Sequence, residues 1–234
     1  NLNSYYDKNL KIDRNKELLD YSKKYQKKFS FFLIDIKNKK EIQRLFNKYN
    51  FLKVFHLAAQ PGVRYSFIKP HKYIESNVLG FFNILENCKN HKVKKLIFAS
   101  SSSVYGATKK IPYNESFSET SPIQLYAATK LSNEIMASTY CKLFKFQIIG
   151  LRFFTVYGPW GRPDMALFKF TKNIFKNKKI YIYNKGNHSR DFTYISDIVD
   201  GIVLAVKNPA KKNRKWNPYK PDPSSSIYPF RIYN

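Results

Sequence analysis

The stretch "KKLIFASSSSVYG", residues 94–106, contains a short apolar run that ends in consecutive serines. A nearly continuous apolar run of this length is typical of a strand buried on both faces of a parallel sheet. Comparable runs occur at "FFLIDI" (31–36), "FLKVFHLAA" (51–59), "FQIIGLRFF" (146–154) and "KIYIY" (179–183). Segments with helical periodicity lie near 12–28, 38–50, 71–90, 122–144, 164–178 and 194–207. This alternation predicts an α/β fold with a doubly wound parallel sheet, and "FRIYN" (230–234) is expected to add a short strand.

Composition narrows the class of protein. The 234 residues are 43% hydrophobic, which is enough for a sizeable core in one domain or slightly more. The formal charge of +26 suits nucleic acid, but Lys is spread over nearly every segment rather than clustered, so we expect no nucleic-acid function. Anionic small molecules would benefit from the same field. No apolar run approaches the roughly 18 residues of a membrane span. We therefore expect no association with a membrane, and we expect a cytoplasmic location.

Cysteine and histidine content indicates neither a disulfide framework nor a metal site. Cys88 and Cys141 are isolated within helix-like segments and are expected to fill the core. The four histidines lack the spacing of metal ligands.

A tyrosine and a lysine four residues apart lie on one face of any helix that contains them. Five Tyr-x-x-x-Lys pairs occur, where composition alone predicts roughly 2.6, so the spacing carries little information. Only Tyr126 and Lys130 fall inside a continuous helical segment, about one turn after Ser121 as expected N-cap and Pro122 as first helical residue. This pair is therefore the candidate catalytic dyad.

The serine run that follows residues 94–100 places several hydroxyls at the carboxyl end of an expected central strand. Ligands bind at this edge in doubly wound sheets. Taken alone, such a run is equally typical of a flexible loop. The loop contains no acidic residue.

Further motifs accompany these two. They are "NLNSYYD" (1–7), "HLAAQPGVRYSFIKP" (56–70), "SNVLGFFNILE" (76–86), "LRFFTVYGPWGRPDMALFKFTK" (151–172), "RDFTYISDIVDGI" (190–202) and "PDPSSSIYPFRIYN" (221–234). With them the chain resembles the nucleotide-sugar epimerase/dehydratase family of extended short-chain dehydrogenases/reductases, most closely its UDP-glucuronate 4-epimerases. The resemblance implies a Rossmann-like sheet, NAD as cofactor, a UDP-sugar as substrate and a homodimer.

The resemblance also implies a mechanism. Tyr126 would be the base, Lys130 its electrostatic partner and Ser101 the hydroxyl that orders the reacting group of the sugar. A phenol with a pKa near 10 needs an adjacent ammonium to act as a base at pH 7. The implied reaction removes the C4 hydroxyl proton, transfers hydride to NAD, rotates the keto-sugar and returns the hydride to the opposite face.

The remaining roles implied by the resemblance concern the cofactor and the sugar. Cofactor contacts would be Asp35, Ile36, Leu57, Ala58, Ala59, Gln60, Asn77, Ser100, Tyr126, Lys130 and Phe154. Substrate contacts would be Ser101, Ser102, Tyr126, Thr155, Arg162 and Arg190. Five of these residues have a structural alternative: a helix cap for Asp35, core packing for Ala58 and Ala59, a solvated charge for Arg190, and a surface ion pair with Asp164 for Arg162.

The chain departs from the family at its ends. It has no G-x-G-x-x-G fingerprint, and "NLNSYYD" corresponds to a position after the family's second strand. We therefore expect a fragment truncated at both ends that neither binds NAD nor folds cooperatively alone. Residues 1–160 would be a partial NAD-binding domain with the catalytic helix. Residues 161–234 would be a partial substrate-binding region, interleaved with the last sheet elements.

Three alternatives remain. A UDP-glucose 4-epimerase would lack the "GPWGRPDMALFKF" run and would typically have Asn in place of Thr155. A 4,6-dehydratase would have an acidic residue in the serine loop to help eliminate water. A non-catalytic NAD-binding or RNA-associated protein would not need Ser101, Tyr126 and Lys130 together.

Overall fold

The computed structural model describes residues 2–187 and 189–234, and its contacts divide the chain into two compact units. One unit combines Asp35–Phe154 with Val199–Asn234, and the other combines the residues up to Ile34 with Thr155–Ile198. Each unit is described by itself. These units divide the chain differently from the expected boundary at residue 160, which concerns function and stays a prediction.

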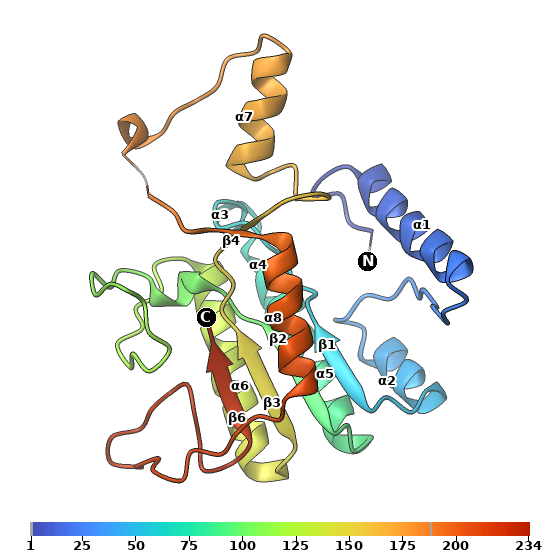
Figure 1. The fold of residues 1–234 in the computed structure, drawn as a ribbon, viewed down its shortest axis with the longest axis vertical. Coiled ribbons are helices and arrows are strands. Elements are labelled where there is room, and N and C mark those ends of the chain that lie inside the picture. Colours follow the sequence, from blue (N-terminus) through green and yellow to red (C-terminus); the bar gives the residue numbers. More distant parts are fainter. Residues whose placement is uncertain (1, 188) are drawn as a thin grey trace. The chain divides into compact units, whose positions relative to one another are not determined.

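The larger unit is built on a parallel sheet in the order β1-β2-β3-β6 (Figure 1). The register pairs Phe55 with Ile97, Ile97 with Ile149, and Ile149 with Arg231. The strands are β1 (Lys53–His56), β2 (Lys95–Ala99), β3 (Gln147–Leu151) and β6 (Phe230–Tyr233). The predicted doubly wound parallel sheet is confirmed, and so is the strand expected at 230–234.

Helices cover both faces of this sheet, which explains why its strands are apolar without alternation. On one face, Ile97 and Ile149 pack with Ala205 of α8 (Ile195–Lys207). On the other face, Phe98 of β2 lies 5.0 Å, between ring centroids, from Phe81 of α5 (Gly80–Asn90). The remaining helices of this unit are α2 (Lys39–Lys48), α3 (Tyr65–Ile68), α4 (Pro70–Tyr73), the π-helix η1 (Ile74–Leu79), the 3-10 helix η2 (Ser102–Tyr105) and α6 (Leu125–Phe144).

The smaller unit contains a short parallel ladder of β4 (Thr155–Tyr157) and β5 (Phe192–Tyr194). Neither of these three-residue strands was predicted from the sequence. The unit also contains α1 (Lys8–Lys24), α7 (Ala166–Phe175) and the 3-10 helix η3 (Asn184–Gly186).

Two strand predictions are wrong. Residues 31–36 are irregular, with the backbone N–H of Ile34 donating to the carbonyl of Phe32 at 3.0 Å. Residues 179–183 are also irregular, and Tyr181 and Ile182 are exposed. An apolar run becomes a strand only beside a hydrogen-bonding neighbour, and composition does not reveal whether that neighbour exists.

The predicted start of the catalytic helix is also wrong. Helix α6 begins at Leu125 after Gln124, whose side chain makes no capping hydrogen bond. Ser121 instead forms a parallel β-bridge with Gly106. The bridge extends the backbone through Ser121 and Pro122, which delays the helix by about one turn.

Within the described residues, no helix is long and apolar enough to cross a membrane. The same residues contain no group of three or more His, Cys, Asp or Glu side chains that could hold a metal ion. His188, one of the four histidines in the metal-site prediction, lies outside the described residues, as does Asn1 of the "NLNSYYD" motif.

Candidate active site

Tyr126 and Lys130 lie one turn apart on α6, as predicted. Lys130 is almost completely buried, and its Nζ donates to the backbone carbonyl of Ala99, at the end of β2, at 2.7 Å. Burial lowers the pKa of Lys130 to about 8, and the charge of Glu134 opposes this shift. The ring of Tyr126 is half-buried and packs edge-on against Tyr73, with centroids 6.2 Å apart. The helix therefore brings its lysine directly to the carboxyl end of a central strand.

The serine run adopts a fixed turn rather than an unstructured loop. Ser101 is the N-cap of η2, and its Oγ accepts from the backbone N–H of Ser103 at 3.2 Å and from the hydroxyl of Ser103 at 2.9 Å. The backbone N–H of Ser102 donates to the carbonyl of Phe153 at 2.9 Å. Gly106 ends the turn with φ 58° and ψ −118°, a conformation suited to glycine. These contacts hold Ser101 at the same strand end as Lys130.

Asn77 joins the loop after β1 to α6. Its side chain accepts from the backbone N–H of Gln60 at 2.7 Å and donates to the Gln60 carbonyl at 3.1 Å. It also donates to Thr129 Oγ1 at 3.1 Å, while that hydroxyl donates to the carbonyl of Tyr126 at 2.7 Å. Asn77 lies in the π-helical segment η1, and such segments are frequent at functional sites. Sequence reasoning missed Thr129, although its position three residues after Tyr126 places it on an adjoining part of the helix.

The other predicted cofactor residues of this unit have varied surroundings. Asp35 accepts from the backbone N–H of Lys37 at 3.1 Å, whereas the N-cap of α2 is Asn38, so the helix-cap alternative for Asp35 is wrong. Leu57 and Ala58 are exposed and Ala59 is half-buried, so core packing does not account for Ala58. The carbonyl of Ile36 accepts from Asn83 of α5 at 3.0 Å. Phe154 follows β3 and lies 6.1 Å, between ring centroids, from Tyr113.

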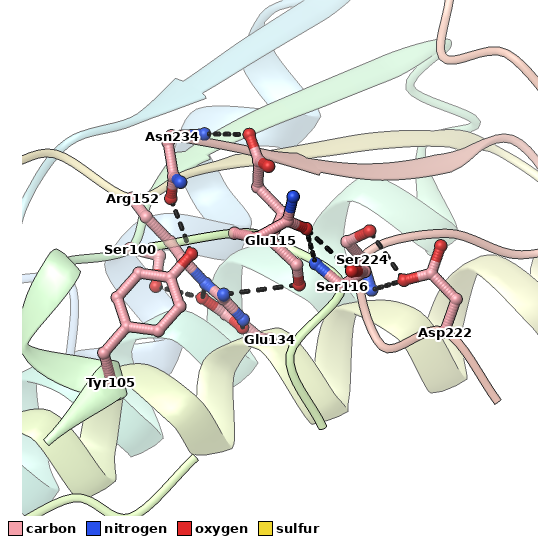
Figure 2. A network of polar contacts seen from close by, with 10 residues as sticks. Ser100, Tyr105, Glu115, Ser116, Glu134, Arg152, Asp222, Ser224 and Asn234 are labelled. Carbon is pink, nitrogen blue, oxygen red and sulfur yellow. Dashed lines mark hydrogen bonds and ion pairs between the residues drawn. The ribbon is translucent and has the colours of Figure 1, made fainter. Parts of the chain in front are cut away.

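Behind the serine run lies a buried ion pair that the sequence did not indicate (Figure 2). Glu134 Oε1 accepts from Arg152 Nε at 2.9 Å and its Oε2 accepts from Arg152 Nη2 at 2.8 Å. The hydroxyl of Ser100 donates to the same Oε1. Buried charged residues are rare and have no periodic signature, so their pairing becomes evident only when the elements are packed. The pair connects α6, β2 and the end of β3.

His56 ends β1, at the same carboxyl edge of the sheet at which Ala99 ends β2. It is buried against the ring of Phe81, with centroids 5.2 Å apart, and its Nε2 has no hydrogen-bond partner in the part of the chain that the structure describes. Burial, together with the charge of Lys130, lowers the pKa of His56 to about 3. His56 is therefore neutral at physiological pH.

The remaining predicted substrate residues belong to the smaller unit. Thr155 begins β4, and its backbone N–H donates to the carbonyl of Asp191 at 3.2 Å. Arg190 is exposed and donates to the carbonyl of Ser189 at 2.6 Å.

Arg162 forms a bidentate pair with Asp164, through Nε to Oδ1 at 3.0 Å and Nη2 to Oδ2 at 2.9 Å. The hydroxyl of Tyr5 donates to the same Oδ2 at 2.9 Å. The ion pair anticipated as the structural alternative for Arg162 is thus present. One edge of the guanidinium is engaged by a carboxylate of the chain itself.

Comparison with known proteins gives consistent relatives. Residues 4–217 match the NAD-dependent epimerase/dehydratase family. Protein CapI of Staphylococcus aureus is 48% identical over 233 residues, which cover 100% of this chain and 68% of CapI. UDP-glucuronate 4-epimerase 4 of Arabidopsis thaliana is 46% identical over 217 residues, 90% of this chain and 48% of that protein.

Solved structures agree with these relatives. A UDP-glucuronic acid 4-epimerase from Bacillus cereus, solved with UDP-glucuronic acid and NAD, matches with a TM-score of 0.69 at 38% identity. The match covers 77% of this chain and 56% of that one. A UDP-glucose 4-epimerase from Thermotoga maritima, solved with UDP-glucose, matches with a TM-score of 0.72 at 28% identity, over 76% of this chain and 59% of that one. The chain thus spans little more than half the length of these solved proteins.

Proposed function

The chain belongs to the NAD-dependent epimerase/dehydratase family, and on this premise we propose that the whole protein is a nucleotide-sugar 4-epimerase that interconverts UDP-glucuronate and UDP-galacturonate. The observation that carries the proposal is the placement of Tyr126 and Lys130 one turn apart on α6, with Lys130 anchored beside the serine run. A binding module would have no need to bury an ammonium at this strand end, because desolvating a charge is costly.

The donor set fits the nicotinamide end of NAD. An ammonium carries three N–H donors, and the one directed to Ala99 leaves Lys130 able to donate to ribose hydroxyls. When bound, NAD accepts a hydride from the sugar and later returns it. The Gly-rich phosphate-binding loop is not in this sequence, so the chain's own residues contribute at the nicotinamide end.

The chain's residues would handle the proton. The positive charge of Lys130 favours the phenolate of Tyr126, which takes the proton from the C4 hydroxyl of the sugar. The Ser101 hydroxyl, held by η2, orders that hydroxyl for attack. On return of the hydride to the other face of the keto-sugar, Tyr126 gives the proton back. The absence of an acidic residue in residues 100–106 favours this route over a dehydratase.

Replacing the base tests the mechanism. We expect Tyr126→Phe in the whole protein to lower kcat at least a hundredfold with NAD still bound, because acid–base catalysis is worth about 10²–10⁴ in rate. Tyr140→Phe removes another tyrosine hydroxyl from α6, one that bonds Glu86, and is the matched control with kcat within about twofold of wild type. Epimerisation by Tyr126→Phe above a tenth of the wild-type rate contradicts the assignment.

The choice of UDP-glucuronate rests on Arg162 and Thr155. A guanidinium recognises a sugar carboxylate in a way that lysine does not reproduce. We expect Arg162→Leu to lower kcat/KM for UDP-glucuronate by a factor that corresponds to about 2–4 kcal/mol of lost transition-state stabilisation. The value for UDP-glucose should change far less.

The pair with Asp164 supplies the control for this experiment. If Arg162→Leu acts only by breaking the ion pair and loosening the loop, Asp164→Asn will produce the same losses on both sugars. If Arg162 recognises the carboxylate, Asp164→Asn retains the preference for UDP-glucuronate. Equal losses on both substrates in Arg162→Leu reduce the substrate to an unspecified UDP-sugar.

A further inference from the structure

We propose that the buried Glu134–Arg152 pair is a positioning device that sets the catalytic helix α6 against the serine run. The inference rests on the proposed function only in naming Tyr126, Lys130 and Ser101 as the groups being positioned. Glu134 lies four residues after Lys130, and the two share the buried side of α6. Neither Glu134 nor Arg152 is among the residues of the mechanism above.

Two consecutive residues are each hydrogen-bonded to α6: the last residue of β2 and the residue that follows it. The carbonyl of Ala99 accepts from Lys130 at 2.7 Å, and the next residue, Ser100, donates its hydroxyl to Glu134. Ser101 follows directly. Because the two ties are one turn apart on the helix and one residue apart on the strand, they fix the rotation of α6 as well as its distance from Ser101.

Arg152 gives Glu134 a single orientation. Its guanidinium engages both carboxylate oxygens and lies 4.8 Å from the ring centroid of Tyr105, while Arg152 itself is completely buried. The hydroxyl of Tyr105 donates to Asn234 Oδ1 at 2.7 Å, and the backbone N–H of Asn234 donates to Glu115 at 2.8 Å (Figure 2). The carboxylate that accepts from Ser100 therefore belongs to a network of contacts that extends through Arg152 and Tyr105 to Asn234, which follows β6.

A pair kept for stability alone would be an expensive choice, since buried ion pairs are often no more stable than apolar residues of similar volume. A pair that fixes geometry has a different consequence. Its loss loosens the serine turn and misplaces the proton-transfer groups, which lowers kcat while substrate and NAD still bind.

The experiment compares Glu134→Gln, Ser100→Ala and their double variant in the whole protein. Each single change should lower kcat at least tenfold with KM within about threefold. Because both changes act on the same hydrogen bond between Ser100 and Glu134, the double variant should be no more than about threefold worse than the poorer single variant. Glu86→Gln, at a carboxylate that bonds Lys89 and Tyr140 away from the serine run, is the control and should keep wild-type kcat.

Hydrogen exchange of the amides in residues 100–106 gives a readout that does not depend on turnover. We expect at least tenfold faster exchange in Glu134→Gln and Ser100→Ala, and wild-type exchange in Glu86→Gln. Unchanged exchange in this peptide overturns the inference whether or not the protein is an epimerase. Multiplying losses in the double variant, or a lower melting temperature with wild-type kcat, also overturn it. Retained epimerisation in Tyr126→Phe counts against the proposed function and not against the positioning pair.

Discussion

At the scale of single residues, burial lowers the pKa of two groups at the end of the sheet. His56 has its pKa lowered to about 3, and burial is the main cause, with the charge of Lys130 adding to it. The same burial lowers the pKa of Lys130 to about 8. The charge of Lys130 thus disfavours the charged form of His56, whereas the charge of Glu134 opposes the shift of Lys130. A neutral His56 adds no second positive charge beside Lys130, which lies one turn from Tyr126 on α6.

The buried histidine predicts a loss of stability in acid. In the unfolded chain His56 takes up a proton near pH 6.5, whereas in the folded protein it does so only near pH 3. The contribution of His56 to the free energy of unfolding is therefore fully present above pH 6.5 and is lost as the pH falls toward 3. At pH 5 the expected cost relative to pH 7 is about 2 kcal/mol.

Chemical denaturation of the whole protein at both pH values measures this cost. His56→Phe should lose about 2 kcal/mol less than wild type between pH 7 and pH 5. His71→Gln, at an exposed histidine, is the control and should behave as wild type. If His56→Phe loses as much stability in acid as the wild type, His56 is not the cause of the acid sensitivity.

Residue chemistry was only partly predictable from the sequence. The candidate pair Tyr126 and Lys130 follows from its place inside a helical segment, and the serine run from its place after a strand. The choice of Ser101 within that run follows from the family resemblance. Glu134 and Arg152 lie 18 residues apart on different elements, and their pairing depends on how α6 packs on the sheet. His56 was considered only as a metal ligand, because its burial against Phe81 is not visible in the sequence.

At the scale of elements, the turn between β2 and α6 depends on Gly106. This residue has φ +58°, and a Cβ there would lie 1.6 Å from the backbone carbonyl oxygen of Ser121. Backbone cannot move aside as a side chain can. The close approach allows the β-bridge to Ser121 and so fixes where α6 begins.

We expect Gly106→Ala to destabilise the protein by about 3 kcal/mol or more, because it combines a strained backbone with a clash. Gly201→Ala is the matched control. Gly201 lies in α8 with nothing within 4 Å of an added Cβ, so this change should stabilise the protein by up to about 1 kcal/mol. Thermal melting of both variants measures the difference. A Gly106→Ala variant as stable as wild type would show that the bridge is dispensable.

Elements were predictable where burial on both sides makes a strand continuously apolar. β1, β2 and β3 were found on this basis, and β6 was expected as a short strand. Residues 31–36 and 179–183 are similarly apolar but form no strand. The apolar pattern of a segment does not show whether a neighbouring strand is available to pair with it. The three-residue strands β4 and β5 are too short for any period to appear.

At the scale of the whole molecule, helices α5 and α6 present apolar side chains to solvent as well as to the sheet. Phe82 is 40% exposed, Ile135 60% and Leu143 63%. Tyr140 joins the two helices, with its ring 6.4 Å from Phe82 and its hydroxyl donating to Glu86 at 2.5 Å. An outward apolar surface on two packed helices is typical of an interface between subunits.

We therefore expect the whole protein to be a homodimer built from α5 and α6, as the family resemblance implied. Ile135→Glu places a charge on this surface and should give monomers at micromolar concentration, because an isologous interface would bury the charge twice. Ile174→Glu is the matched control, since Ile174 is also 60% exposed but lies on α7. Light scattering distinguishes the two variants. A wild-type monomer, or a dimer that persists in Ile135→Glu, contradicts the predicted interface.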